Sequence, residues 1–141
     1  MLEGLAMPAP DGDSAPFWNG CEEGKLMLQR CDGCGQASWP PGPVCASCGG
    51  DRLTWVESQG RGTVYSWVVV AVAFTPELAD QLPYAVGLVD LEDGVRMVTT
   101  FEGCEPNEIE AGMEVEMRFD ESREGQRLFC HVPAGSDRGS R

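Results

Sequence analysis

The sequence has little of what most enzymes need for acid–base or nucleotide chemistry. Its 141 residues contain a single histidine, His131, so a Ser-His-Asp or Cys-His arrangement would have to use that one side chain. We interpret His131 as a residue on the surface or at the rim of a barrel. Neither G-x-G-x-x-G nor G-x-x-x-x-G-K-[ST] occurs, which argues against the commonest nucleotide-binding loops. We therefore do not expect the chain to be an enzyme on its own, and we assign no catalytic residue.

Positive charge is also scarce. The chain has 10 lysines and arginines against 23 acidic residues, a formal net charge of −13, and the basic residues are scattered singly from Lys25 to Arg141. Such a chain is repelled by phosphate backbones and by anionic membrane surfaces. The charge favours a protein partner, with no nucleic acid and no membrane.

Long apolar runs are absent as well. No stretch approaches the roughly 20 apolar residues that a membrane-spanning helix needs. The first residues, MLEGLAMPAPDGDSAP, have neither a basic nor an apolar segment of a signal peptide. The expected compartment is the cytoplasm, where disulfides are rare. Because the seven cysteines are also an odd number, metal binding is favoured over a disulfide framework.

What the sequence does have is a cysteine constellation. Cys31, Cys34, Cys45 and Cys48 form C-x₂-C-x₁₀-C-x₂-C, and a glycine follows each pair. Each C-x-x-C turn places two sulfurs on one side of a knuckle, and the glycine permits the sharp reversal that follows. Two facing knuckles complete a tetrahedral S₄ site with no open coordination position. We expect a structural metal here, Zn²⁺ first, with Fe as the alternative.

The rest of the sequence predicts a mainly β chain. A short helix capped by Ser14 ends near Glu23, and LMLQRC is extended. Five antiparallel strands follow, over residues 63–74, 84–91, 95–101, 113–119 and 126–132, with Asp93-Gly94 as a hairpin turn. Five short strands bury a core by closing, so we expect a five-stranded OB-type barrel. The predicted divisions are a flexible leader (1–13), the helix and zinc ribbon (14–58), the barrel (59–133) and a disordered tail (134–141).

The remaining cysteines and the aromatic residues are weaker signals. Cys21 and Cys130 are interpreted as packing residues. Cys104 lies in a connector, where a reactive thiol could be placed, but the neighbouring Glu102 and Glu105 would raise the pKa of this thiol. Tyr65 and Trp67 are expected on one face of a strand, and a stacking platform for single-stranded nucleic acid is the alternative use of such a face. The missing basic groove argues against that use.

The combined motifs resemble a known family. F-W-x-G, L-x-L-Q-R-C, the two knuckles, G-x-G-x-V-Y-S and G-C-x-P are together similar to OB-fold proteins with an N-terminal rubredoxin-like zinc ribbon, long catalogued as a domain of unknown function. The resemblance covers about residues 15–133. It implies a helix, a zinc ribbon and an OB barrel. It also implies an accessory role beside thiolase-like enzymes that act on acyl-CoA, in acyl transfer or in steroid side-chain degradation by retro-aldol cleavage.

Three functions follow from these observations. The first is a stand-alone, non-catalytic subunit of a thiolase-like aldolase or acyltransferase, with acyl-CoA at the shared interface and a hydratase-like subunit as a further candidate partner. Arg61 is then the residue to test as a contact to CoA phosphate. The alternatives are a single-stranded nucleic-acid-binding OB-fold protein and an electron carrier with iron in the Cys₄ site.

Overall fold

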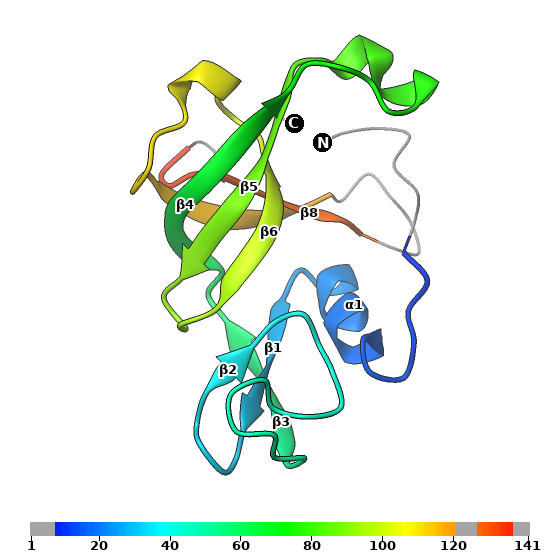
Figure 1. Ribbon diagram of the computed structural model, residues 1–141, viewed down its shortest axis with the longest axis vertical. Coiled ribbons are helices and arrows are strands. Elements are labelled where there is room, and N and C mark those ends of the chain that lie inside the picture. Colours follow the sequence, from blue (N-terminus) through cyan, green and yellow to red (C-terminus); the bar gives the residue numbers. More distant parts are fainter. Residues whose placement is uncertain (1–7, 121–126, 137–141) are drawn as a thin grey trace.

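The structure is a computed structural model and describes residues 8–120 and 127–136. Parts of the expected leader (1–7), of the last turn (121–126) and of the expected tail (137–141) lie outside the described residues. Figure 1 shows two stacked parts: a small sheet with its helix below, and a barrel above. The architecture is mainly β with one short α-helix and a closed five-stranded barrel, as the sequence predicted.

The lower part is built from α1 (Ala15–Glu22) and three strands, β1 (Leu26–Cys31), β2 (Ala37–Ser38) and β3 (Leu53–Ser58). The strand order is β2-β1-β3, with both pairings antiparallel. Neither β2 nor β3 was among the strands expected from the sequence. Central β1 is buried most deeply, so it fixes the position of Cys31 at its end.

Helix α1 begins where the sequence predicted, but its start is capped differently. Ser14 occupies the N-cap position without a side-chain cap bond. Instead, the carboxylate of Asp11 accepts hydrogen bonds from the backbone N–H groups of Asp13 and Ser14, at 3.1 and 2.8 Å. The helix packs Phe17 and Cys21 inward. At Gly20 it lies so close to the start of β1 that an added Cβ would be 2.6 Å from Cγ of Met27 and 2.8 Å from the backbone oxygen of Lys25, the residue before β1.

The barrel contains β4 (Arg61–Val70), β5 (Tyr84–Leu91), β6 (Arg96–Phe101), β7 (Glu114–Phe119) and β8 (Phe129–Pro133), closed in the order β4-β5-β6-β8-β7. Two short 3₁₀ turns, η1 (Pro76–Gln81) and η2 (Pro106–Glu108), lie in its connections. The expectation of all-antiparallel strands was wrong at one place. β6 pairs with β8 in parallel, at Phe101 and His131, because strand direction cannot alternate at every pairing of a closed ring with five strands.

Strand β4 is shorter and less regular than expected. It ends at Val70, so residues 71–74 of the predicted strand lie in the following loop. A register shift between Val64 and Ser66 inserts Tyr65 as an extra residue. Because a bulge breaks the alternation of faces, Tyr65 is exposed while Trp67 packs against the core. The prediction that both aromatic rings share one face was therefore wrong.

Aromatic rings join the two parts of the fold. Phe17 of α1 contacts Trp18, Trp39 and Phe129 edge-on, with centroids 4.9, 6.0 and 5.8 Å away. Trp39 comes from the segment between the knuckles, and Phe129 from β8. Such pairs contribute about 0.5–1.5 kcal/mol each beyond their buried area. This cluster fixes the lower sheet against the barrel.

Within the described residues, no helix is long and apolar enough to cross a membrane.

Candidate metal centre and surrounding surface

The two cysteine knuckles adopt the same local structure. In the first, the N–H of Cys31 donates to the carbonyl of Gln36 and the N–H of Gly35 donates to the carbonyl of Cys31, at 2.9 and 2.8 Å. In the second, Cys45, Gly49 and Gly50 repeat the pattern at 2.7 and 2.9 Å. Gly35 and Gly49 have φ of 76° and 75°, the left-handed conformation that the sequence predicted for them.

The knuckles bring the four predicted ligands together. The sulfurs of Cys31, Cys34, Cys45 and Cys48 all lie within 4.8 Å of one another. The Cys31–Cys48 and Cys34–Cys45 sulfurs are both 3.6 Å apart. In a tetrahedral site with metal–sulfur bonds of about 2.3 Å, the sulfurs are separated by about 3.8 Å. The four thiols therefore fit one tetrahedral metal ion with little rearrangement.

Electrostatics around the sulfurs favour thiolates that share a cation. The backbone N–H of Cys48, followed by that of Ser47, lowers the pKa of the Cys45 thiol to about 6. The pKa of Cys31 is lowered as well, chiefly by the backbone N–H of Cys34. Cys34 behaves oppositely: the N–H of Gln36 lowers its pKa, but burial and the adjacent sulfurs outweigh this and raise it to about 11. A dication among these sulfurs would relieve the crowding of negative charge.

The other cysteines do not join this group. Cys21 and Cys130 are buried, and burial raises the pKa of each thiol to about 12. Cys104 is half-buried; burial first, then Glu108 and Glu105, raises its pKa. The predicted packing roles of Cys21 and Cys130 agree with these positions. A raised pKa makes Cys104 a weak nucleophile at neutral pH.

His131 is not the surface or rim residue that the sequence suggested. It is completely buried in β8, and its Nδ1 lies 3.0 Å from the hydroxyl of Thr99 in β6. Because that hydroxyl donates to the Thr100 carbonyl at 3.0 Å, it accepts from Nδ1–H. Nε2 is buried and has no hydrogen-bond partner among the described residues. Burial lowers the pKa of His131 to about 4, and the backbone of Gly60 opposes this only in part.

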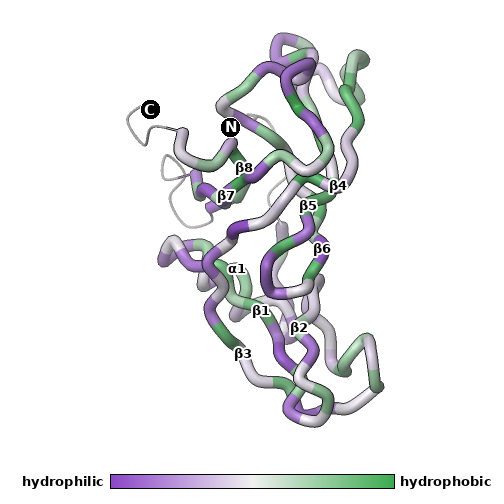
Figure 2. Tube along the Cα trace, turned by 90° about the vertical axis from the view of Figure 1, so that its left-hand side faces the viewer, coloured by the Kyte–Doolittle hydropathy of each residue, from purple (hydrophilic) through white to green (hydrophobic). Residues whose placement is uncertain are grey.

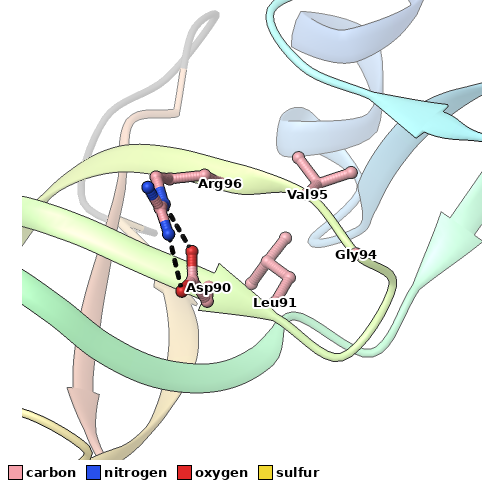
Figure 3. A pocket seen from close by; sticks show the side chains of 5 residues that line it. All are labelled: Asp90, Leu91, Gly94, Val95 and Arg96. Atoms are coloured by element: carbon pink, nitrogen blue, oxygen red, sulfur yellow. Dashed lines mark hydrogen bonds and ion pairs between the residues drawn. The ribbon is translucent and has the colours of Figure 1, made fainter. Parts of the chain in front are cut away.

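A hollow of about 330 Å³ lies at the β5–β6 turn, lined by Asp90, Leu91, Gly94, Val95 and Arg96 (Figure 3). Arg96 binds the carboxylate of Asp90 through Nε and Nη2, at 2.6 and 3.0 Å. Its guanidinium also lies 3.5 Å from the centroid of the Tyr65 ring. The guanidinium of Arg96 therefore already contacts the Tyr65 ring and the Asp90 carboxylate, so neither the ring nor the positive charge is well placed to bind a nucleobase or a phosphate.

A second hollow, of about 260 Å³, lies at the end of the barrel near Phe101 and Pro83. Its lining includes Glu102, Cys104 and Glu105, and none of the described residues that line it is lysine or arginine. Two carboxylates at this mouth disfavour the phosphates of CoA.

Arg61, the predicted CoA contact, begins β4 and is exposed. Across the β4–β7 pairing it lies opposite Glu116. It lines neither of the two hollows.

Comparison with known proteins identifies both parts of the fold. Residues 18–54 match the family described as "ChsH2, rubredoxin-like zinc ribbon domain", and residues 55–120 match "ChsH2, C-terminal OB-fold domain". A "DUF35 domain-containing scaffold protein" of Methanothermobacter thermautotrophicus is 35% identical over 100 residues, which span 70% of this chain and 74% of the relative. This chain belongs to the DUF35 family.

Other relatives of this DUF35 chain are enzyme subunits. A "Probable enoyl-CoA hydratase alpha subunit" of Thermomonospora curvata is 38% identical over 90% of the chain, but the chain spans only 39% of that protein. The "Benzoylsuccinyl-CoA thiolase subunit BbsA" of Thauera aromatica is 28% identical over 89% of this chain and 81% of its own length. A solved structure, "Ltp2-ChsH2(DUF35) aldolase", contains a chain that is 37% identical, with a TM-score of 0.79 over 90% of this chain and 98% of that one.

Proposed function

We propose that this DUF35 chain is a non-catalytic, zinc-bearing subunit that binds and stabilises a thiolase-like enzyme acting on acyl-CoA. The observation that carries the proposal is the match to the ChsH2(DUF35) chain of an aldolase, which this fold follows over 98% of that chain's length. The thiolase-subunit name of the Thauera relative supports the same class of partner.

The distribution of reactive groups supports a role without catalysis. Four thiols converge on one closed site, and a metal with four protein ligands leaves no position for a substrate. Raised pKa values keep Cys21 and Cys130 protonated, and burial keeps His131 from the surface. The carbon–carbon or acyl-transfer chemistry then belongs to the partner. The aldolase title of the solved relative supports retro-aldol cleavage, and the steroid side chain remains an expectation from the family resemblance.

The metal is proposed to be Zn²⁺ held by Cys31, Cys34, Cys45 and Cys48, with Fe as the alternative. Its chemistry would be structural: four thiolate bonds close the knuckles and contribute to folding. Elemental analysis should find about one zinc per colourless chain. The Cys45→Ser variant should lose the metal and melt at a lower temperature than the wild type. The control variant Cys104→Ser, which changes a cysteine outside the group, should keep the metal and the wild-type melting temperature. A red protein containing iron, or stoichiometric zinc in Cys45→Ser, would contradict this assignment.

The partner is tested by mild purification of the tagged chain from its native host, with mass spectrometry of the co-eluting proteins. A thiolase-like protein at near-equal stoichiometry supports the proposal, and the purified pair should cleave or transfer an acyl-CoA that this chain alone leaves unchanged. Co-elution with single-stranded nucleic acid, lost as salt rises, would instead favour the nucleic-acid alternative.

Arg61 is proposed as a contact to CoA phosphate at the shared interface, supported by its exposed cation in an otherwise acidic chain. In the reconstituted pair, Arg61→Gln should raise KM for acyl-CoA with little change in kcat. An unchanged KM would remove Arg61 from the site. The division of the chain at residues 14–58 and 59–133 likewise stays a proposal, testable by limited proteolysis.

A further inference from the structure

Strand β4 extends well beyond the strand that covers one of its edges. β7 pairs only with Arg61–Thr63, and the last bonds on that side join Val64 to Met113 and Gly112, at 3.0 and 2.8 Å. On the other side, pairing with β5 continues to Val70. The segment Ser66–Val70 therefore has one edge that is hydrogen-bonded and one edge that pairs with no strand in the described parts of the chain.

Apolar side chains are exposed along this open edge and just beyond it. The exposed fractions are 63% for Val68, 46% for Val69, 71% for Val72 and 81% for Phe74. In Figure 2 the tube above the β4 label is largely green, the colour of hydrophobic residues. An open edge of the sheet and exposed apolar side chains thus coincide on one segment.

The sequence does nothing to block this edge. Folded proteins usually protect an open strand edge with a charge, a proline or a covering segment, because such an edge pairs readily with other chains. From Tyr65 to Phe74 the sequence reads YSWVVVAVAF, without a single charged residue or proline. Among the described strands this edge is unpaired, and its composition suits pairing with another chain.

Charge decides which kind of chain fits. Two copies of this protein would bring two formal charges of −13 together, and their repulsion disfavours self-association. A partner segment of low negative charge meets no such penalty. Strand addition uses main-chain hydrogen bonds for affinity and alternate apolar side chains for fit, which are the two features that this edge offers.

We propose that the open edge of β4, Ser66–Val70 with Val72 and Phe74, docks an extended apolar segment of the partner enzyme by β-strand addition. The inference rests on the proposed function, since it assigns the docking surface for that partner. The partner's strand would continue the β4–β5 sheet outward, and Phe74 would pack on its apolar side chains.

The test uses the full chain and the thiolase-like subunit recovered with it. Val69→Lys places a charge on the edge, and Val44→Lys is the matched control, since Val44 is 50% exposed on the cysteine-bearing part. Val69→Lys should weaken binding by at least about tenfold, and Val44→Lys should not. Phe74→Ser, in the loop, provides a second variant should Val69→Lys fail to fold. Hydrogen exchange should show residues 66–70 protected on binding.

The outcomes separate the two proposals. Unchanged affinity for Val69→Lys and Phe74→Ser, with no new protection at 66–70, would overturn edge docking while leaving the accessory function intact. Failure of the wild-type chain to bind any thiolase-like subunit would overturn both. A homodimer of the isolated chain that Val69→Lys dissociates would show that a second copy, rather than the enzyme, occupies the edge.

Discussion

We predict that His131 makes the stability of the folded protein sensitive to mild acid. Its pKa is lowered to about 4 by burial, against about 6.5 for an unfolded histidine. Between these two values the unfolded chain binds a proton at His131 and the folded protein does not. The full stabilisation is therefore present above pH 6.5, and the free energy of unfolding falls as the pH drops from 6.5 toward 4. Linkage then gives a loss on the order of 1 kcal/mol at pH 5.5 and on the order of 2–3 kcal/mol at pH 4.5, relative to pH 7.5.

The sequence makes this prediction unusually direct to measure, because His131 is the only histidine. In tag-free protein, one imidazole signal reports the titration by NMR, and it should stay neutral from pH 8 to pH 5. Urea unfolding at several pH values should show a loss of unfolding free energy below pH 6.5 that is larger in the wild type than in His131→Phe. The part of the loss that comes from carboxylates and metal ligands should be the same in both proteins. An imidazole pKa of 6 or above, or parallel stability curves, would refute the reasoning.

Three further predictions concern the lower part of the fold. Removing the metal with a chelator should lower the melting temperature, and restoring zinc should reverse this; an unchanged melting curve would argue that the knuckles hold without metal. Gly20→Ala should lower the free energy of unfolding by about 1 kcal/mol in urea, because the close contact with the Lys25 oxygen outweighs the higher helix propensity of alanine. The control Gly12→Ala has open space around the added Cβ and should leave the free energy of unfolding nearly unchanged. Leu28→Ala should lose about 3 kcal/mol because Leu28 is fully buried in the central strand; a loss below 1 kcal/mol would contradict its place in the core.

Features encoded by neighbouring residues were predictable from the sequence. The knuckles follow from four cysteines and two glycines within a short segment, whose sulfurs converge as the spacing predicts. The β5–β6 turn at Asp93-Gly94 was predictable for the same reason: Gly94 has φ of 84°, a conformation that the sequence supplies locally.

Features created by distant residues were not predictable. The bulge at Tyr65 interrupts a stretch made mostly of residues that favour strand, so the local sequence gives no clear sign of it. His131 looked like a rim residue because an alternating strand normally exposes every second side chain. In β8, however, the consecutive residues Cys130, His131 and Val132 are all buried, so the strand does not alternate between buried and exposed side chains. The aromatic contacts of α1 with Phe129 likewise depend on residues far apart in sequence.

The parallel pairing of β6 with β8 also sets an order of events for a chain leaving the ribosome. β5 and β6 are joined by a short turn at residues 92–95, and β4 precedes β5 across residues 71–83. These three strands can pair before β7 and β8 are made, since local pairings form quickly. The ring closes only when Phe101 meets His131, after β7 and β8 have been synthesised. Until then the sheet is not closed, and its apolar inner face is exposed to water. We therefore expect chaperones and proteases to recognise a nascent or truncated chain that lacks β8.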